Sequence, residues 1–142
     1  MSLRKLLTAW GFVLLTSGFA HADLNAYIRN VNVSAEGNIG GYRTQLGVHY
    51  GASGPALDLA FRSVDSPAEV AILLWLGQRS SKPMETVVEV YRKQKGQGWG
   101  AIAQSLGIKP GSADFHALKQ GNLGWQPEQN AAKEGGKGKG KK

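Results

Sequence analysis

The apolar residues between residues 98 and 108 recur at helical spacing. They occupy positions i, i+3, i+4 and i+7, as Trp99, Ile102, Ala103 and Leu106. Residues at this spacing share one face of a helix. Gly107 follows as a typical left-handed stop, and Ile108 is placed to fold back over the last turn. The pattern predicts a short amphipathic helix that ends in a glycine turn.

A second short helix is expected after this turn. Pro110 cannot continue the first helix because it lacks a backbone N–H, and Ser112 is a good N-cap. Phe115 and Leu118 would be the buried positions, and Gly121 would end the helix. Paired helices of this kind also occur in DNA-binding proteins. A DNA-reading helix would carry Arg, Lys, Asn or Gln on its first exposed turn. An acidic residue stands there instead, so the pair is more typical of a small closed core.

An apolar run at residues 70–76 follows the clearest helix-start signal in the chain. Ser66 can act as the N-cap, Pro67 suits the first helical position, and Glu69 can complete a capping box. The helix that follows, to about Arg79, is apolar almost all round. This distribution is typical of a buried central helix.

A further amphipathic helix is expected to open at Lys82-Pro83 and to end before Gly96. Its outer face carries Glu89, which is expected to pair with Arg92 or Lys93 on the surface. Its inner stripe consists of Met84, Val87, Val88 and Tyr91.

The N-terminal third of the chain gives weaker signals. Residues 23–37 fit both helical and alternating spacing, but their asparagines and Val33 disfavour a helix. An extended segment or short strand is therefore expected there. Asn38 can cap a helix that runs to Tyr50, although three glycines weaken it. A hairpin with strands at about 27–34 and 42–50 is the alternative. The inner face of the helix would hold Ile39, Tyr42 and Leu46.

A turn at residues 51–54 separates this region from another short helix. Pro55 suits the first turn of that helix. Its apolar face would hold Ala56, Leu57, Ala60, Phe61 and Val64.

The run GWGAIAQSLGIKPGSADFHALKQG, residues 98–121, carries the pattern GWGxIAxxLGIKPGSxxFHALK. It resembles the C-terminal signature of a family of small secreted bacterial proteins of unassigned function. The preceding segment, SPAEVAILLWLGQRSSKPMETVVEVYRKQKGQ, resembles the segment before that signature in the same family. The resemblance covers roughly residues 38–121. It implies an exported, mostly helical fold and favours the helix over the hairpin for residues 38–50. It implies no catalytic residues.

The first 22 residues have the features of a secretory signal peptide. Arg4 and Lys5 form a basic start, residues 6–19 are apolar, and residues 20–22 form an A-x-A cleavage site. We expect cleavage after Ala22, a periplasmic or secreted location, and no transmembrane span after cleavage. The chain contains no cysteine, which excludes disulfides, thiol redox chemistry and thiolate metal ligands.

The net charge of +7 is unevenly distributed. Arg4 and Lys5 contribute +2 and residues 133–142 contribute +4, which leaves +1 for residues 23–132. This near neutrality argues against a folded nucleic-acid surface. Trp125, just before the basic end, either packs back on the domain or is the exposed tryptophan. The Lys/Gly-rich end is expected to be disordered. Its lysines are candidates for contact with an anionic envelope polymer or lipid: Lys133, Lys137, Lys139, Lys141 and Lys142.

No set of titratable residues predicts catalysis. Ser112, Asp114 and His116 alternate along one short helix, so they would point to different faces and cannot form a relay. His49 and His116 lack the spacing of a metal site, and no cofactor is expected. The glycines of residues 96–100 precede a helix and could cradle an anion, but a helix–helix joint is the favoured interpretation.

These patterns together predict a mainly α fold. The expected architecture is a small multi-helix orthogonal bundle with an extended or short-strand N-terminal segment and a disordered basic C-terminal tail. Its parts would be a signal peptide at 1–22, a helical domain at 23–126 and the tail at 127–142. The expected function is a non-enzymatic exported binding module of the bacterial envelope, with an unknown envelope protein as partner. Alternatives are tethering to an anionic polymer or lipid through the tail and, more weakly, helix-turn-helix nucleic-acid binding.

Overall fold

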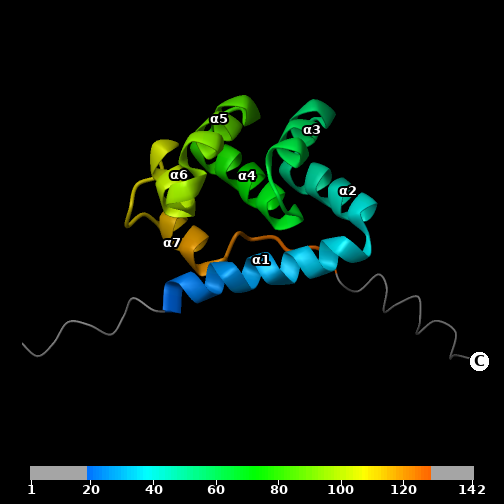
Figure 1. Cartoon of the computed structure of the whole chain (residues 1–142), viewed down its shortest axis with the longest axis horizontal. Coiled ribbons are helices and arrows are strands. Elements are labelled where there is room, and N and C mark those ends of the chain that lie inside the picture. The colour runs from blue at the N-terminus through cyan, green and yellow to red at the C-terminus, as the bar shows by residue number, and fades with distance from the viewer. Residues whose placement is uncertain (1–18, 129–142) are drawn as a thin grey trace, which may run out of the picture.

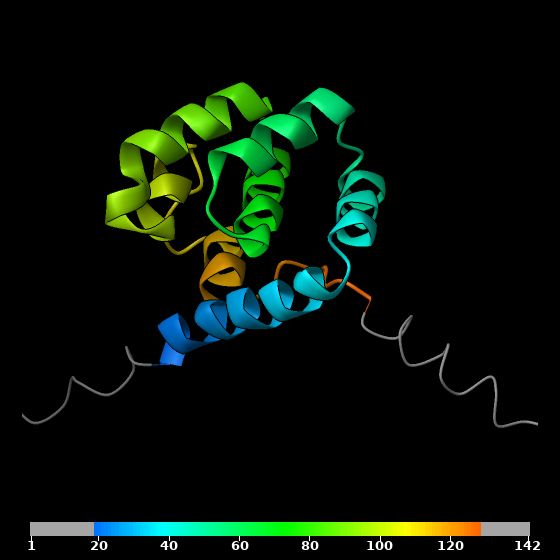
Figure 2. The same cartoon turned by 45° about the vertical axis from the view of Figure 1, so that its right-hand side comes forward.

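A computed structural model describes residues 19–128, which form a helical bundle without strands (Figure 1). The predicted mainly α fold is confirmed for this part of the chain. Helix α4 lies at the centre, in contact with α1, α2, α3 and α5, and α1 runs along one side of the bundle (Figure 1 and Figure 2). The elements are α1 (Phe19–Gly37), α2 (Ile39–Tyr50), α3 (Gly54–Ser63), α4 (Pro67–Ser80), α5 (Met84–Gln94), the 3-10 turn η2 (Lys95–Gln97), α6 (Trp99–Ser105) and α7 (Ala113–Gln120).

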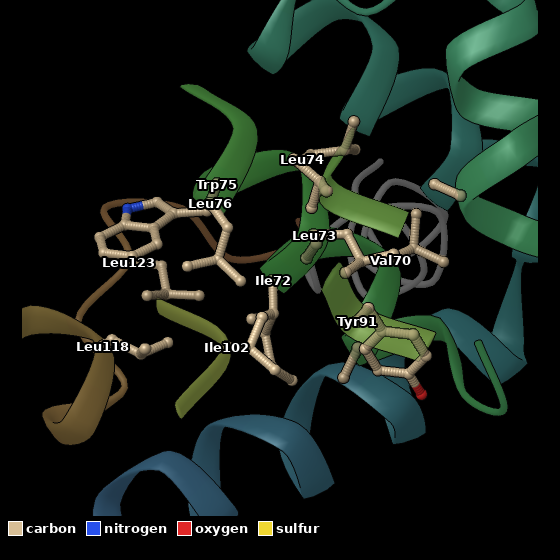
Figure 3. Close-up of a cluster of buried hydrophobic side chains, with 14 of the residues drawn as sticks. Val70, Ile72, Leu73, Leu74, Trp75, Leu76, Tyr91, Ile102, Leu118 and Leu123 are labelled. Carbon is tan, nitrogen blue, oxygen red and sulfur yellow. The ribbon is translucent and has the colours of Figure 1, made fainter. Parts of the chain in front are cut away.

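Helix α4 forms the centre of the core, as its sequence predicts. Every residue from Val70 to Gly77 is buried. Figure 3 shows the α4 side chains clustered with Tyr91 of α5, Ile102 of α6 and Leu118 of α7. One helix therefore supplies the apolar surface against which most of the others pack.

The predicted capping box at the start of α4 is present. The Glu69 carboxylate accepts hydrogen bonds from the backbone N–H groups of Ser66 at 2.9 Å and Asp65 at 3.0 Å. Its other oxygen accepts a hydrogen bond from the Tyr91 hydroxyl at 3.1 Å. The cap thus fixes the start of α4 and also joins it to α5.

The expectation of an extended segment or strand at residues 23–37 is wrong, because these residues belong to α1. Tyr27, Val31 and Ala35 are buried at i, i+4 and i+8, so burial against α4 and α7 outweighs the poor helix propensity. The Asn32 side chain also accepts a hydrogen bond from the Ala68 backbone N–H at 2.8 Å. An asparagine that weakens α1 locally therefore satisfies a free donor in the first turn of α4.

Helix α2 confirms the helical interpretation of residues 38–50, and the hairpin alternative is wrong. Asn38 is the N-cap and accepts a hydrogen bond from the Gly41 N–H at 2.9 Å. A Cβ on Gly41 would lie 2.5 Å from the Asn38 side chain, and one on Gly47 would lie 3.1 Å from Leu57. These two glycines therefore allow the cap and the close approach of α3. Ile39 does not lie on the inner face as expected, since it is 51% exposed.

The predicted turn between α6 and α7 is confirmed in detail. Gly107 has a φ of 94°, and the Ile108 N–H donates to the Ala103 carbonyl at 2.9 Å. Ile108 is buried, as a residue that folds back over a helix end should be. Ser112 caps α7 by accepting a hydrogen bond from the Phe115 N–H at 3.2 Å.

Residues 121–128, which we call the C-terminal strap, follow α7 without regular structure and pack back on the domain. Leu123 and Pro127 are buried and Trp125 is partly buried, whereas the residues between them are exposed. The Tyr27 hydroxyl donates to the Trp125 carbonyl at 3.2 Å, and the Glu128 N–H donates to the Gln45 side chain at 3.0 Å. Trp125 therefore packs back on the domain, and the packed chain runs past residue 126.

Two strap glycines provide a test of the contact between α7 and α1. Gly121 and Gly124 both have positive φ, 68° and 73°. A Cβ on Gly121 would lie 2.7 Å from the Asp23 carbonyl oxygen, whereas a Cβ on Gly124 would meet nothing within 4 Å. Gly124→Ala is expected to cost about 1–2 kcal/mol from backbone strain. Gly121→Ala should cost about 1–3 kcal/mol more, because α1 must move.

Denaturant unfolding of residues 23–142 measures both substitutions. Equal losses of stability would show that α1 does not press on Gly121.

Candidate binding site

A hollow of about 500 Å³ lies where α1, α6 and α7 meet. This volume is in the range of small-molecule sites. We call it the α6 hollow. It is lined by Leu24 and Asn25 of α1, Gln97 of η2, the N-cap Gly98, Trp99, Gly100, Ala101 and Gln104 of α6, and Phe115, Leu118 and Lys119 of α7.

Close packing of α6 and α7 forms the floor of the α6 hollow. Gly100 faces α7 here, since a Cβ on it would lie at ordinary contact distance from the Phe115 ring, 3.5 Å, and from Lys119 Cε, 3.7 Å. Phe115 and Leu118 are buried one helical turn apart on α7. Trp99 is partly buried, and its ring centroid lies 5.6 Å from that of Tyr91. The floor is therefore apolar and held by contacts on both helices.

The polar groups of the α6 hollow are uncommitted. Within residues 19–128, the side-chain amides of Asn25, Gln97 and Gln104 form no hydrogen bond to another protein group. Lys119 Nζ lies 5.3 Å from the Phe115 ring centroid and forms no ion pair with a described carboxylate. No carboxylate of residues 19–128 lines the hollow. Its wall therefore offers three amides and one cation to a bound molecule.

Only part of this site was recognisable in the sequence. The glycines of residues 96–100 predict a helix–helix joint, and this segment does join α5 to α6 through η2. The same segment also lines the hollow. No sequence pattern marks Asn25 or Lys119 as part of a site, because they reach the hollow only through the packing of α7 against α1 and α6.

A second hollow, of about 410 Å³, lies between α3 and α5. Lys93 Nζ donates a hydrogen bond to Glu89 Oε1 at 2.9 Å, and this bond lowers the pKa of Glu89. The predicted surface pair of Glu89 is therefore with Lys93. Both charges are exposed and satisfy each other, so this hollow offers less to a ligand than the α6 hollow.

The residues considered for catalysis have separate roles or positions. Ser112 caps α7, and the Asp114 carboxylate forms an ion pair with Arg79 at 3.6 Å. His116 is exposed on α7. The His49 ring lies 4.6 Å from the Tyr50 ring and 5.9 Å from the Trp125 ring. Within residues 19–128 no group of three or more His, Cys, Asp or Glu side chains is placed to hold a metal ion.

An aromatic cluster lies under the strap. Trp125 has ring contacts with Tyr42 at 5.7 Å and Tyr50 at 6.3 Å. Burial raises the pKa values of Tyr27, Tyr42 and Tyr50 above that of a free tyrosine. The buried Tyr50 hydroxyl has no hydrogen-bond partner among the described residues. This cluster is closed by the strap and is part of the core.

The candidate lysines of the tail, Lys133, Lys137, Lys139, Lys141 and Lys142, lie outside the described residues. None of the helices in residues 19–128 has the length and apolar character needed to cross a membrane. Comparison of the chain with protein-family models, curated proteins and solved structures found no match in any of the three.

Proposed function

We propose that this protein is an exported, non-enzymatic binding module of the bacterial envelope and that the α6 hollow is its recognition element. The observation that carries the proposal is the set of uncommitted polar groups, three amides and Lys119, around an apolar floor. Sites for small molecules commonly combine an apolar lining with a few placed polar groups. The signal-peptide features of residues 1–22 support export.

Binding is favoured over catalysis by the composition of the lining. General acid–base catalysis needs a titratable group beside the reacting atoms, and a nucleophile needs an activating base. Among the described residues that line the hollow, Lys119 is the one with a titratable charge. The amides can orient a ligand through hydrogen bonds but cannot exchange protons with it at neutral pH.

Filling the α6 hollow is expected to abolish partner binding. Gly100→Leu places a side chain toward Phe115 and Lys119, where the hollow lies. Gly96→Leu is the matched control, because a Cβ there meets nothing within 4 Å and Gly96 does not line the hollow. Pull-downs from envelope extract with residues 23–142 would compare both variants with the parent chain, and circular dichroism would establish that each is folded.

The expected result is loss of the captured component with Gly100→Leu and its retention with Gly96→Leu. Gln104→Ala provides a second variant, since Gln104 is exposed and its removal leaves the core intact. If both hollow variants capture the same component as the parent, the proposed recognition element is wrong.

A second candidate function is electrostatic tethering through the tail. Residues 133–142 carry a net charge of +4, whereas residues 23–132 carry +1. A lysine near an anionic membrane contributes about 1 kcal/mol, and the attraction is screened by salt. On this proposal residues 133–142 make the contact and the bundle carries them. Retention of residues 23–142 on anionic vesicles should then fall with salt and be lost in residues 23–132. Equal retention of both chains would rule out the tether.

A further inference from the structure

We propose that the α6 hollow binds the C-terminal end of a short peptide, with Lys119 taking the terminal carboxylate and the amides pairing with peptide groups. This inference rests on the proposed function of the hollow and adds the class of ligand. Three observations support it: an unpaired cation, uncommitted amides on three elements, and an apolar floor between them.

The cation is suited to one carboxylate. Arg43, Arg79, Lys93 and Lys95 form ion pairs within the described chain, whereas its other basic side chains, Lys119 included, do not. Lys119 is the one described basic side chain that lines the hollow, and its ammonium group lies over the Phe115 ring at 5.3 Å from the centroid. Contact with an aromatic face holds a cation in place without neutralising it. No carboxylate in the described lining competes for Lys119, so within this part of the chain a ligand carboxylate meets one free positive charge.

The amides are suited to peptide groups. Each carboxamide offers N–H donors and a carbonyl acceptor. A peptide bond also carries one N–H donor and one carbonyl acceptor, so the two can exchange hydrogen bonds in both directions. Asn25, Gln97 and Gln104 stand on α1, η2 and α6, so they approach a ligand from different elements. A phosphate or sulfate would use only their donors and would favour several Arg or Lys groups. One lysine with three amides fits a carboxylate attached to peptide bonds better.

The floor is suited to apolar side chains. Leu24, Phe115 and Leu118 line the hollow together with Trp99. A saccharide would use an aromatic face for stacking, but one face of Trp99 already packs near Tyr91, with ring planes inclined by 30°. A peptide needs no stacking platform, because aliphatic side chains gain from any apolar surface. The floor therefore favours a peptide over a sugar, and the sugar becomes one outcome of the test.

The experiment is a two-dimensional NMR titration of residues 23–142 with four probes. These are acetyl-Ala-Leu with a free carboxylate, the same dipeptide as its C-terminal amide, N-acetylglucosamine and N-acetylmuramic acid. Acetyl-Ala-Leu is expected to shift the backbone amide signals of Gly98, Gly100 and Lys119. The amide form is expected to bind at least about tenfold more weakly, because it lacks the charge-assisted hydrogen bond.

Lys119→Met tests the role of the cation, and Lys109→Met is the matched control on the turn before α7. Lys109 is exposed and does not line the hollow. Lys119→Met is expected to lower the affinity for acetyl-Ala-Leu at least about tenfold and to leave the affinity for the amide form unchanged. Lys109→Met should change neither affinity.

Each remaining outcome overturns the inference in a recognisable way. Equal binding of the acid and amide forms would remove the carboxylate role. Preference for either sugar would assign the hollow to a glycan. If no probe shifts the hollow signals while envelope capture still depends on Gly100, the ligand class is wrong and the proposed function stands. If capture is also independent of Gly100, both proposals fail.

Discussion

Raising the pH above about 10 is expected to destabilise the fold by about 1.4 kcal/mol per pH unit for each tyrosine that stays neutral in the folded state. Burial raises the pKa values of all four tyrosines, Tyr27, Tyr42, Tyr50 and Tyr91. Their unfolded pKa is about 10, so above that pH the unfolded chain binds fewer protons than the folded chain. The stabilising contribution is complete below pH 10 and is lost as the pH rises toward the folded pKa values.

Denaturant unfolding at several alkaline pH values measures this loss, and tyrosinate absorbance follows ionisation in the same samples. Ionisation should appear together with unfolding. Gradual appearance of tyrosinate near pH 10 in a protein that remains folded would contradict the prediction, because it would place the tyrosines in water.

Two phenylalanine substitutions separate ionisation from hydrogen bonding. Tyr42→Phe loses the hydrogen bond from its hydroxyl to the Pro67 carbonyl, at 2.6 Å, and should cost about 1 kcal/mol at neutral pH. The Tyr50 hydroxyl is buried without a hydrogen-bond partner among residues 19–128, so Tyr50→Phe should leave the free energy of unfolding unchanged at neutral pH. In both variants, the loss of unfolding free energy per pH unit above about pH 10 should be smaller by the contribution of one tyrosine.

Ile72→Ala is expected to lower the free energy of unfolding by about 2–5 kcal/mol. Ile72 is fully buried in α4, at 0% exposure, among residues from several helices (Figure 3). The substitution removes apolar contacts and leaves a cavity in a core that cannot collapse freely. Denaturant unfolding monitored by circular dichroism measures the change.

Ile39→Ala is the matched control, because the same side chain is removed where Ile39 is 51% exposed at the start of α2. Its cost should stay within about 0.5 kcal/mol. A loss comparable to that of Ile72→Ala would mean that a partner, such as a second copy of the chain, covers Ile39 in solution.

The sequence was most informative where short-range chemistry decides the structure. The start of α4 follows from Ser66, Pro67 and Glu69, because a capping box needs only residues a turn apart. The turn after α6 follows from Gly107 for the same reason, since the left-handed stop and the fold-back of Ile108 are local.

Predictions from the sequence were wrong or incomplete where contacts with distant parts of the chain determine the structure. Residues 23–37 form a helix because α4 and α7 bury one of its faces, which outweighs local propensity. Alternate residues of the strap pack on the domain, with contacts to Tyr27 of α1 and to Tyr42 and Tyr50 of α2. This alternation could not be recognised from the sequence, because the helices that bury the strap lie far from it along the chain. The α6 hollow combines residues 24–25 with residues 97–104 and 115–119, and only the glycine-rich segment among them carried a binding-site pattern in the sequence.

The position of α1 has a consequence for the order in which the fold forms during synthesis. Among the described helices α1 is made first, yet it packs against α4 and α7, and Tyr27 bonds to the strap. On the ribosome, α1 therefore emerges well before the last of its partners, and a helix without partners is marginal in water. The native bundle closes only when the chain through Trp125 is available. Any segment that precedes α1 would thus remain attached to an incompletely folded chain until residues as far as Trp125 have emerged.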